Sequence, residues 1–363
     1  MNKLLSKRNI TKKPLHLLNY IVLLISHKLR LLHVPVLPST IDIEPNNWCN
    51  FRCDHCQVTH WSKPKNELST QQFEKIIKQF PKLLLVTVQG MGEPFLNKST
   101  IDMISSLDEK GIASESTSNG SVMPESLLNK FAKLKFFSLY FSMDGGTKKT
   151  FEDIRVDGNF DKVTRNIKRL TQRCPTMELG LWSVISNKNM HECEAVVDVA
   201  HNVGVPNVVF QTFMTNWGKG DMEEKINNKI VNPQRAKKYI DQAIINGKNK
   251  QINTMSYSAD YLDVGTACIW PWTSMYIDAT GYVVPCCAIA DSSTLNFGNV
   301  FEKDIKEIWN STEYKSFRKK LKDGDIPKVC ERCYRSNISK DSPTLNDPVV
   351  EHIMVQKVIP SGK

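Results

Sequence analysis

The sequence predicts an α/β fold: a partial (β/α)6 barrel followed by a small α+β domain. Between residues 40 and 215, short β-rich runs alternate with amphipathic helical stretches, and the alternation repeats six times. Such alternation indicates parallel strands joined by right-handed crossovers. Six units are too few to close an eight-stranded barrel, so we expect an open one. At 363 residues the chain is long enough for this domain and an appendage.

The first six strands and their helices follow from this alternation. The expected strands are Ile41–Pro45, Leu83–Gln89, Ile112–Ser118, Phe136–Ser142, Leu179–Ile185 and Asn207–Gln211. The expected helices are Thr70–Phe80, Ile101–Lys110, Glu125–Ala132, Asp161–Arg173 and Glu192–Val203. Ser69 is placed to cap the first helix and Gly111 to end the second. In such folds the chemistry gathers on loops beyond the carboxyl ends of the strands.

The remainder of the chain is less regular and divides by composition. Residues 216–266 are polar and rich in Lys and Asn, which predicts a bridging region with one helix over Pro233–Ile245. A small domain is expected over residues 267–336, and residues 337–363 form a tail without a strong pattern. The small domain is predicted to hold a hairpin of Met275–Ala279 and Tyr282–Pro285, then an amphipathic helix over Asp304–Lys322.

Residues 1–39 form a basic amphipathic segment. The formal net charge is +10, and seven Lys or Arg residues precede the first acidic residue, Asp42. The apolar run 17–25 is far shorter than the roughly 20 residues of a spanning helix, so we expect a helix that lies on a membrane or on the protein itself. The excess charge indicates a solvated Lys-rich surface or an anionic partner. Nucleic acid is not expected as that partner, because no nucleic-acid-binding signature occurs.

Ten cysteines carry the strongest chemical signal. They form two tight groups with scattered members, unlike the framework of a short disulfide-rich secreted domain, and they favour metal binding in a reducing, cytoplasmic compartment. Cys49, Cys53 and Cys56 follow the first strand with the spacing C-x3-C-x2-C. Structural zinc requires four protein ligands, whereas an iron–sulfur cube held by three thiolates leaves one iron open to a small molecule.

This motif, directly after the first strand of a six-fold β/α pattern, resembles the signature of radical S-adenosylmethionine (SAM) enzymes, whose core is a partial TIM-like barrel. The resemblance implies a [4Fe–4S] cluster on Cys49, Cys53 and Cys56, with SAM chelating the open iron. It also implies reductive cleavage of SAM to a 5'-deoxyadenosyl radical, which abstracts hydrogen from a substrate. The implied electron donor is a reductase with flavodoxin or ferredoxin.

Further motifs occur in the order that this family shows. "QGMGEPFL" is similar to its Gly-rich stretch, although Met91 separates the two glycines, and "STSNG", "FSMDGG" and "DIR" follow. Asp144 in the third of these motifs is expected to cap the next turn. The resemblance implies SAM contacts by His55, Gly90, Gly92, Glu93, Asn119, Ser142 and Arg155.

The second cysteine group comprises Cys268, Cys286, Cys330 and Cys333. Its spacing alone leaves a four-cysteine zinc site open. The surrounding sequence, including "GYVVPCC" and "CERCY", resembles the SPASM/twitch extension of radical SAM enzymes. The resemblance implies one fully ligated auxiliary [4Fe–4S] cluster, with Cys286 preferred over the adjacent Cys287. Cys174 and Cys193 are expected to be buried free thiols.

The cysteine count favours one reaction class but leaves others open. A single auxiliary cluster that accepts an electron is similar to the arrangement in the dehydrogenase of aminocyclitol antibiotic pathways. We therefore expect an oxidoreductase that dehydrogenates a sugar or cyclitol alcohol. The alternative is a maturase that modifies a ribosomally synthesised peptide or protein. A zinc- or cluster-bearing binding protein without catalysis is the third class.

Overall fold

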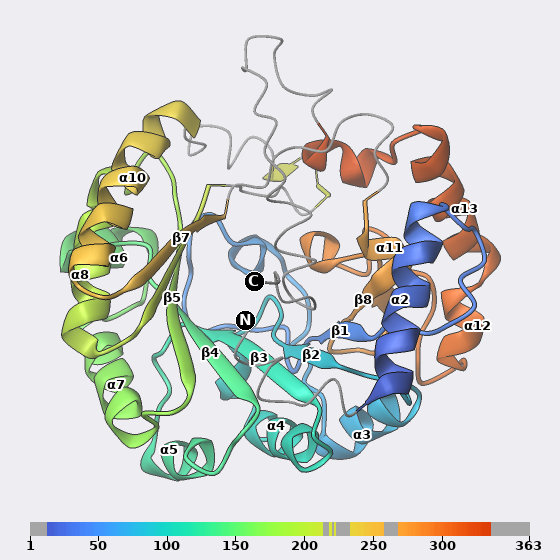
Figure 1. The fold of residues 1–363 in the computed structure, drawn as a ribbon, viewed down its shortest axis with the longest axis horizontal. Helices are drawn as coiled ribbons and strands as arrows, with labels where there is room; N and C mark the ends of the chain where they lie inside the picture. The colour runs from blue at the N-terminus through green and yellow to red at the C-terminus, as the bar shows by residue number, and fades with distance from the viewer. Residues whose placement is uncertain (1–12, 213–217, 220, 223–232, 258–267, 335–363) are drawn as a thin grey trace.

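One open, mostly parallel sheet runs through the centre of the protein (Figure 1). The computed structural model describes residues 13–212, 218–219, 221–222, 233–257 and 268–334. Within them the nine strands have the order β7-β6-β5-β4-β3-β2-β1-β8-β9, and all neighbours are parallel except β8 and β9. The strands are β1 (Thr40–Ile43), β2 (Leu85–Val88), β3 (Ala113–Ser118), β4 (Phe137–Ser142), β5 (Glu178–Val184), β6 (Asn207–Gln211), β7 (Asn253–Tyr257), β8 (Ser274–Ile277) and β9 (Val283–Val284).

Helices cover the outer side of the curved sheet in Figure 1. Those of the core are α3 (Thr70–Lys78), α4 (Thr100–Glu109), α5 (Glu125–Phe131), α6 (Lys148–Ile154), α7 (Phe160–Arg173), α8 (Cys193–Val203) and α10 (Pro233–Asn249). The N-terminal and C-terminal segments add α2 (Pro14–Lys28), α11 (Trp270–Thr273), α12 (Ile305–Trp309) and α13 (Thr312–Asp323).

Local sequence signals set the ends of these elements. At α3, the Ser69 hydroxyl accepts from the Gln72 backbone N–H at 3.1 Å, and the Gln72 side chain accepts from the Ser69 N–H at 3.0 Å. This reciprocal capping box satisfies two backbone donors that the first turn leaves unpaired. Helix α8 ends at Gly204, whose φ of 78° lies in the left-handed region that glycine adopts without strain.

Apolar periodicity then fixes how the helices pack. Helix α7 buries Val163, Ile167 and Leu170, which are spaced so that they share one face. All four residues of β2 are buried, as expected for a parallel strand with both faces covered. Each fully buried Val, Leu or Ile contributes roughly 1.5–3 kcal/mol relative to exposure, so this layered core accounts for much of the fold's stability.

The six predicted β/α units are confirmed. Every predicted strand between residues 41 and 211 overlaps an observed strand, with ends that agree within two residues. The sheet also stays open, because its order runs from β7 to β9 without a closing pair among the described residues. The carboxyl ends of β1 to β4 therefore lie side by side, and the loops that follow them carry the candidate site residues.

Three features of the sheet and the C-terminal domain differ from the sequence-based expectations, and helix α6 was not predicted. Residues 253–257, assigned by composition to the bridging region, form β7 and extend the sheet beside β6. The predicted hairpin is present as β8 and β9, but β8 also pairs in parallel with β1 and so joins the core sheet. The single helix predicted over 304–322 is wrong: the chain forms α12 and α13, because Ser311 caps a new helix by accepting from the Tyr314 N–H. Residues 337–363 lie outside the described part.

The N-terminal helix α2 docks on the protein's own body. Tyr20 and Leu23 are buried, and the Asn19 side-chain amide donates to the Leu37 carbonyl at 2.9 Å. The Trp272 indole N–H donates to the Leu31 carbonyl at 2.8 Å, which joins the segment after α2 to the C-terminal domain. Among the described residues, no helix has the length and apolar character needed to cross a membrane.

Candidate active site

Three thiols meet in the loop that follows β1. Cys53 is buried, whereas Cys49 and Cys56 are half-buried. A tight turn holds them, because the Cys56 N–H donates to the Cys53 carbonyl at 3.0 Å and the Thr59 hydroxyl donates to the same carbonyl at 2.8 Å. Burial raises the pKa of Cys49 to about 11 and that of Cys53 to about 12, and negative charge on neighbouring thiols adds to both shifts.

These thiols fit an iron–sulfur cluster. Ligand cysteines must be thiolates, and a set of buried, mutually repelling thiolates needs a cationic centre to hold the charge. An iron–sulfur cluster takes each thiolate at a separate iron and so supplies this positive charge.

The loop after β2 approaches the cysteine loop too closely for side chains at its glycines. A Cβ on Gly92 would lie 2.5 Å from the Asn46 carbonyl oxygen and 2.6 Å from that of Trp48. A Cβ on Gly90 would lie 2.3 Å from the Cγ of Glu44. Only glycine therefore fits at these two positions.

Glu93 joins this loop to the end of β3. Its carboxylate accepts from the Ser118 hydroxyl and from the Asn119 backbone N–H, both at 2.7 Å. Burial raises the pKa of Glu93 to about 7, although these hydrogen bonds oppose the shift. The Asn119 side-chain amide lies 3.7 Å from Cys49 Sγ and donates to the Asn50 side chain at 3.0 Å. The structure thus brings Glu93 and Asn119 to the cysteine loop.

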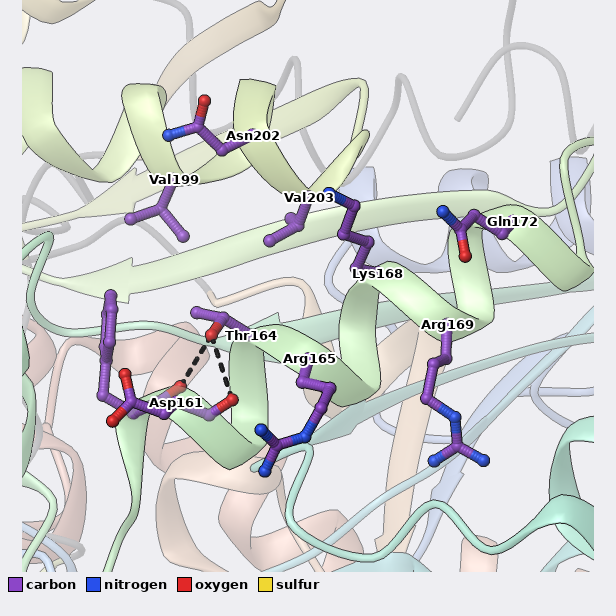
Figure 2. Close-up of a pocket in the computed structure, with 10 residues that line it drawn as sticks. Asp161, Thr164, Arg165, Lys168, Arg169, Gln172, Val199, Asn202 and Val203 are labelled. Atoms are coloured by element: carbon purple, nitrogen blue, oxygen red, sulfur yellow. Dashed lines mark hydrogen bonds between the residues drawn. The ribbon is translucent and has the colours of Figure 1, made fainter.

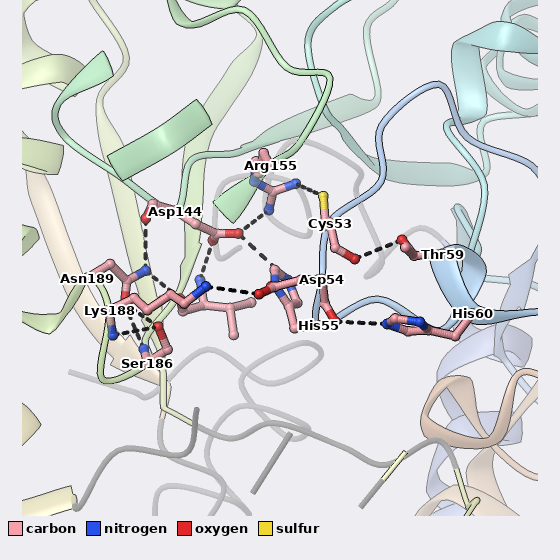
Figure 3. A network of polar contacts seen from close by, with 11 residues as sticks. Cys53, Asp54, His55, Thr59, His60, Asp144, Arg155, Ser186, Lys188 and Asn189 are labelled. Carbon is pink, nitrogen blue, oxygen red and sulfur yellow. Dashed lines mark hydrogen bonds and ion pairs between the residues drawn. The ribbon is translucent and has the colours of Figure 1, made fainter. Parts of the chain in front are cut away.

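A buried ion pair lies beside Cys53 (Figure 3). One guanidinium nitrogen of Arg155 lies 2.7 Å from the Asp144 carboxylate, and another lies 3.9 Å from Cys53 Sγ. His55 Nε2 lies 3.8 Å from the same carboxylate. The other Asp144 oxygen accepts from the Val184 N–H at 2.8 Å. The expectation that Asp144 caps the next turn is therefore wrong: it fixes Arg155 and faces His55.

Ser142 is less closely connected. It is the last residue of β4 and is half-buried. Within the described residues, its side chain makes no hydrogen bond to Asp144, Arg155 or the cysteine loop. Its position at the carboxyl end of β4 places it beside the site.

The four cysteines of the second group come together from three segments. Cys268 precedes α11, Cys286 follows β9, and Cys330 and Cys333 lie in a 3₁₀ turn over 328–333. Burial raises the pKa of Cys286 well above its usual range, and the charges of Cys287, Cys268, Cys333 and Cys330 add to the shift. The adjacent Cys287 packs against the small buried cluster of Tyr276, Val284 and Ala290. Cys174 and Cys193 are buried free thiols, as expected.

Glu44 was not identified from the sequence, yet it joins both parts of the protein. Its carboxylate accepts from the Met91 N–H at 2.8 Å and from the Ala279 N–H at 3.1 Å. It therefore connects the glycine loop to the β8–β9 hairpin. Burial raises the pKa of Glu44 to about 7, and nearby Asp278 adds to the shift. The signal that could have identified Glu44 is its place directly after β1, where site residues gather in such folds.

Asp291 forms a second connection of this kind. Its side chain is fully buried, accepts from Gln57 at 3.1 Å, and pairs with Lys63 and Lys219. Although burial opposes the shift, these partners hold the pKa of Asp291 well below its usual range. Gln57 follows Cys56 directly, so the pairing ties the cysteine loop to the C-terminal domain.

Two cavities lie outside the cysteine sites. A hollow of about 500 Å³ lies between α7 and α8, lined by Thr164, Arg165, Lys168, Val199 and Asn202 among others (Figure 2). It belongs to the outer helical layer and contains none of the candidate site residues. A smaller cavity of about 180 Å³ lies between the end of β1 and the hairpin, where Glu44, Trp61 and Lys63 line it.

Comparison with known proteins identifies the family. The model of the radical SAM superfamily matches residues 43–200, and the model of SPASM, an iron-sulfur cluster-binding domain, matches residues 268–334. The chain is a radical SAM enzyme with a C-terminal SPASM domain. Its cofactors are [4Fe–4S] clusters and SAM, and the two cysteine groups lie in the two matched regions.

Individual relatives of this radical SAM enzyme are distant. It is 23% identical to the tungsten-containing aldehyde ferredoxin oxidoreductase cofactor-modifying protein of Pyrococcus furiosus, over 76% of this chain and 82% of the relative. It is 22% identical to the PqqA peptide cyclase of Rhizobium meliloti, over 83% of this chain and 80% of the relative. Its fold is similar to that of Streptococcus suis SuiB bound to precursor peptide SuiA, with a TM-score of 0.63, 16% identity and coverage of 77% of this chain and 66% of that one.

Proposed function

We propose that this radical SAM enzyme modifies a ribosomally synthesised peptide or protein. The relatives carry the proposal: one is named as a peptide cyclase, and the similar SuiB structure holds a precursor peptide. Dehydrogenation of a sugar or cyclitol alcohol, which the cysteine count alone favours, receives less support from these relatives. The proposed protein partner is a one-electron donor, namely a reductase with flavodoxin or ferredoxin.

The residues take the following proposed roles. Cys49, Cys53 and Cys56 hold the cluster that binds SAM. The remaining SAM contacts are proposed for His55, Gly90, Gly92, Glu93, Asn119, Ser142 and Arg155. Cys268, Cys286, Cys330 and Cys333 hold the auxiliary cluster. When bound, SAM and the clusters supply a radical that removes a hydrogen atom from carbon, together with an acceptor for one electron.

The protein's own groups prepare this site. The glycines at 90 and 92 let backbone carbonyls approach a ligand, and Glu93 provides a buried acceptor for an ammonium group. Asp144 holds the Arg155 guanidinium against Cys53, so a planar donor group is already oriented before any ligand enters. The hydrogen bonds that Glu44 and Asp291 accept hold the C-terminal domain against the glycine loop and the cysteine loop.

The substrate class can be tested with deuterium transfer. Source cells are grown in D2O, and their extract is given to the anaerobic holoenzyme with unlabelled SAM and a strong reductant. Hydrogen abstraction from a true substrate puts one deuterium into the 5'-deoxyadenosine made from unlabelled SAM. Cleavage without substrate adds none, and cleavage of the extract's own SAM gives a multiply deuterated product of different mass. Mass spectrometry of 5'-deoxyadenosine then reports hydrogen abstraction. Extract treated with proteinase K or with periodate, each inactivated before the enzyme is added, separates peptides from sugars.

We expect proteinase K to remove the deuterated product and periodate to leave it. Loss with periodate alone would overturn the peptide assignment and favour the sugar or cyclitol alcohol. Boiled enzyme and a Cys53→Ala variant serve as controls, since neither should release 5'-deoxyadenosine.

A further inference from the structure

The outward face of α2 carries an exposed apolar ridge. We define the α2 ridge as Leu15, Leu18, Ile21, Ile25 and Leu29, which are between 42% and 62% exposed. Their spacing of three and four residues places them on one side of the helix. With Leu31, they make up six of the ten exposed large hydrophobic side chains in the described part of the chain. Such a concentration of apolar surface marks an interaction site.

The opposite face of α2 prevents the ridge from turning inward. Tyr20 and Leu23 are buried against the body, and the Asn19 side chain donates to the Ser39 hydroxyl at 2.8 Å. The His27 and Trp272 rings meet edge to face at 5.6 Å. A roll of the helix would break these contacts, so the ridge is fixed in its outward orientation.

Basic residues lie beside the C-terminal end of the ridge. Lys28 lies in the last turn of α2, and the Arg30 guanidinium donates to the Lys322 carbonyl at 3.2 Å. That contact brings the last turn of α13, with Lys320 and Lys322, beside the ridge. No acidic residue precedes Asp42 in the chain. An apolar face with a basic rim is the pattern of helices that lie in the interface of an anionic membrane.

We propose that the α2 ridge lies on the surface of a membrane that contains anionic lipids. The helix has 15 residues and is therefore about 22 Å long, so it would lie along the interface rather than cross it. The ridge enters the acyl boundary, while Lys28, Lys320 and Lys322 meet lipid phosphates. The proposal is independent of the substrate class.

Vesicle co-sedimentation of the anaerobic holoenzyme tests this surface. The vesicles are phosphatidylcholine alone or phosphatidylcholine with about one third phosphatidylglycerol. The test variant is Leu18→Glu/Ile25→Glu. The matched control is Ile245→Glu on α10, because Ile245 is 60% exposed and lies away from the ridge. Iron content and 5'-deoxyadenosine release show that each variant is folded. If the double Glu variant fails this check, Leu18→Ser/Ile25→Ser replaces it.

We expect the wild type to bind the anionic vesicles, with binding that weakens as salt rises. The double variant should bind at least about tenfold more weakly, and Ile245→Glu should bind like the wild type. Absence of wild-type binding, or equal binding by the double variant, would overturn the proposal. Sedimentation equilibrium tests whether a second copy of the chain covers the ridge instead. If the wild type is a dimer, the double variant is a monomer and neither binds vesicles, the ridge is an interface between two copies of the chain and the membrane proposal is overturned.

Discussion

The two cysteine groups differ in where their thiols come from and in what surrounds them. Cys49, Cys53 and Cys56 lie in one short loop, and polar groups such as Glu93 and Arg155 stand beside them. The four thiols of the second group come from three segments, and the buried rings of Tyr314 and Tyr334 lie near them. Three thiols with polar neighbours suit a cluster that also binds a small molecule. Four thiols with aromatic neighbours suit a cluster that is closed to ligands.

The largest expected effect separates the two groups by activity. Cys53→Ala should reduce 5'-deoxyadenosine release at least about a thousandfold, because the proposed open cluster would lose one of its three thiolates and SAM would lose its anchor. Cys330→Ala should retain release of 5'-deoxyadenosine but lose product formation. Mass spectrometry of 5'-deoxyadenosine and of the modified substrate after anaerobic reconstitution measures both. Equal loss in the two variants would remove the functional distinction between the groups.

A second comparison concerns two adjacent thiols, Cys286 of the second cysteine group and its neighbour Cys287. The charges of all three other thiols of its group raise the pKa of Cys286, whereas Cys287 packs against the cluster of Tyr276, Val284 and Ala290. Cys286→Ala should therefore lose about four irons per chain, and Cys287→Ala should lose none. Iron and sulfide analysis checks this. The reverse result would assign the ligand to Cys287.

The buried ion pair of Asp144 and Arg155, beside the first cysteine group, should also stabilise the folded state. Asp144→Asn leaves Arg155 buried without a charged partner and should lower the free energy of unfolding by about 3–5 kcal/mol. The matched control is Asp153→Asn, which breaks the exposed pair with Lys149 and should leave stability unchanged. Anaerobic urea unfolding measures both. A small effect at Asp144 would mean that water reaches Arg155.

Glu44 should give the connection between the domains a pH dependence. Burial raises its pKa to about 7 in the folded chain, above its unfolded value, so the native state binds the extra proton. Its contribution is present at low pH and is lost as pH rises, by about 2 kcal/mol between pH 5 and pH 7. Glu44→Gln should remove this part of the slope. Urea midpoints at several pH values test it, and an unchanged slope would contradict the assignment.

The features that could be predicted from the sequence are those formed by residues close together along the chain. The cysteine loop, the Gly90 loop and the six β/α units follow from local motifs and periodicity. The sequence did not predict what depends on distant segments. The pairing of β8 with β1 joins residues more than 200 positions apart, and Asn310 at the break between α12 and α13 accepts from the Val34 N–H. Asp144 was misassigned because its partners, Arg155 and the Val184 N–H, meet it only in the folded structure.

Iron and sulfide counts on the wild type and on Cys330→Ala/Cys333→Ala, together with 5'-deoxyadenosine release, test the two-cluster arrangement most directly. We predict about eight irons per wild-type chain and about four in the double variant, with SAM still cleaved by both. About four irons plus one zinc in the wild type would contradict it. The second group would then be a structural zinc site, and no auxiliary cluster would be available to accept an electron.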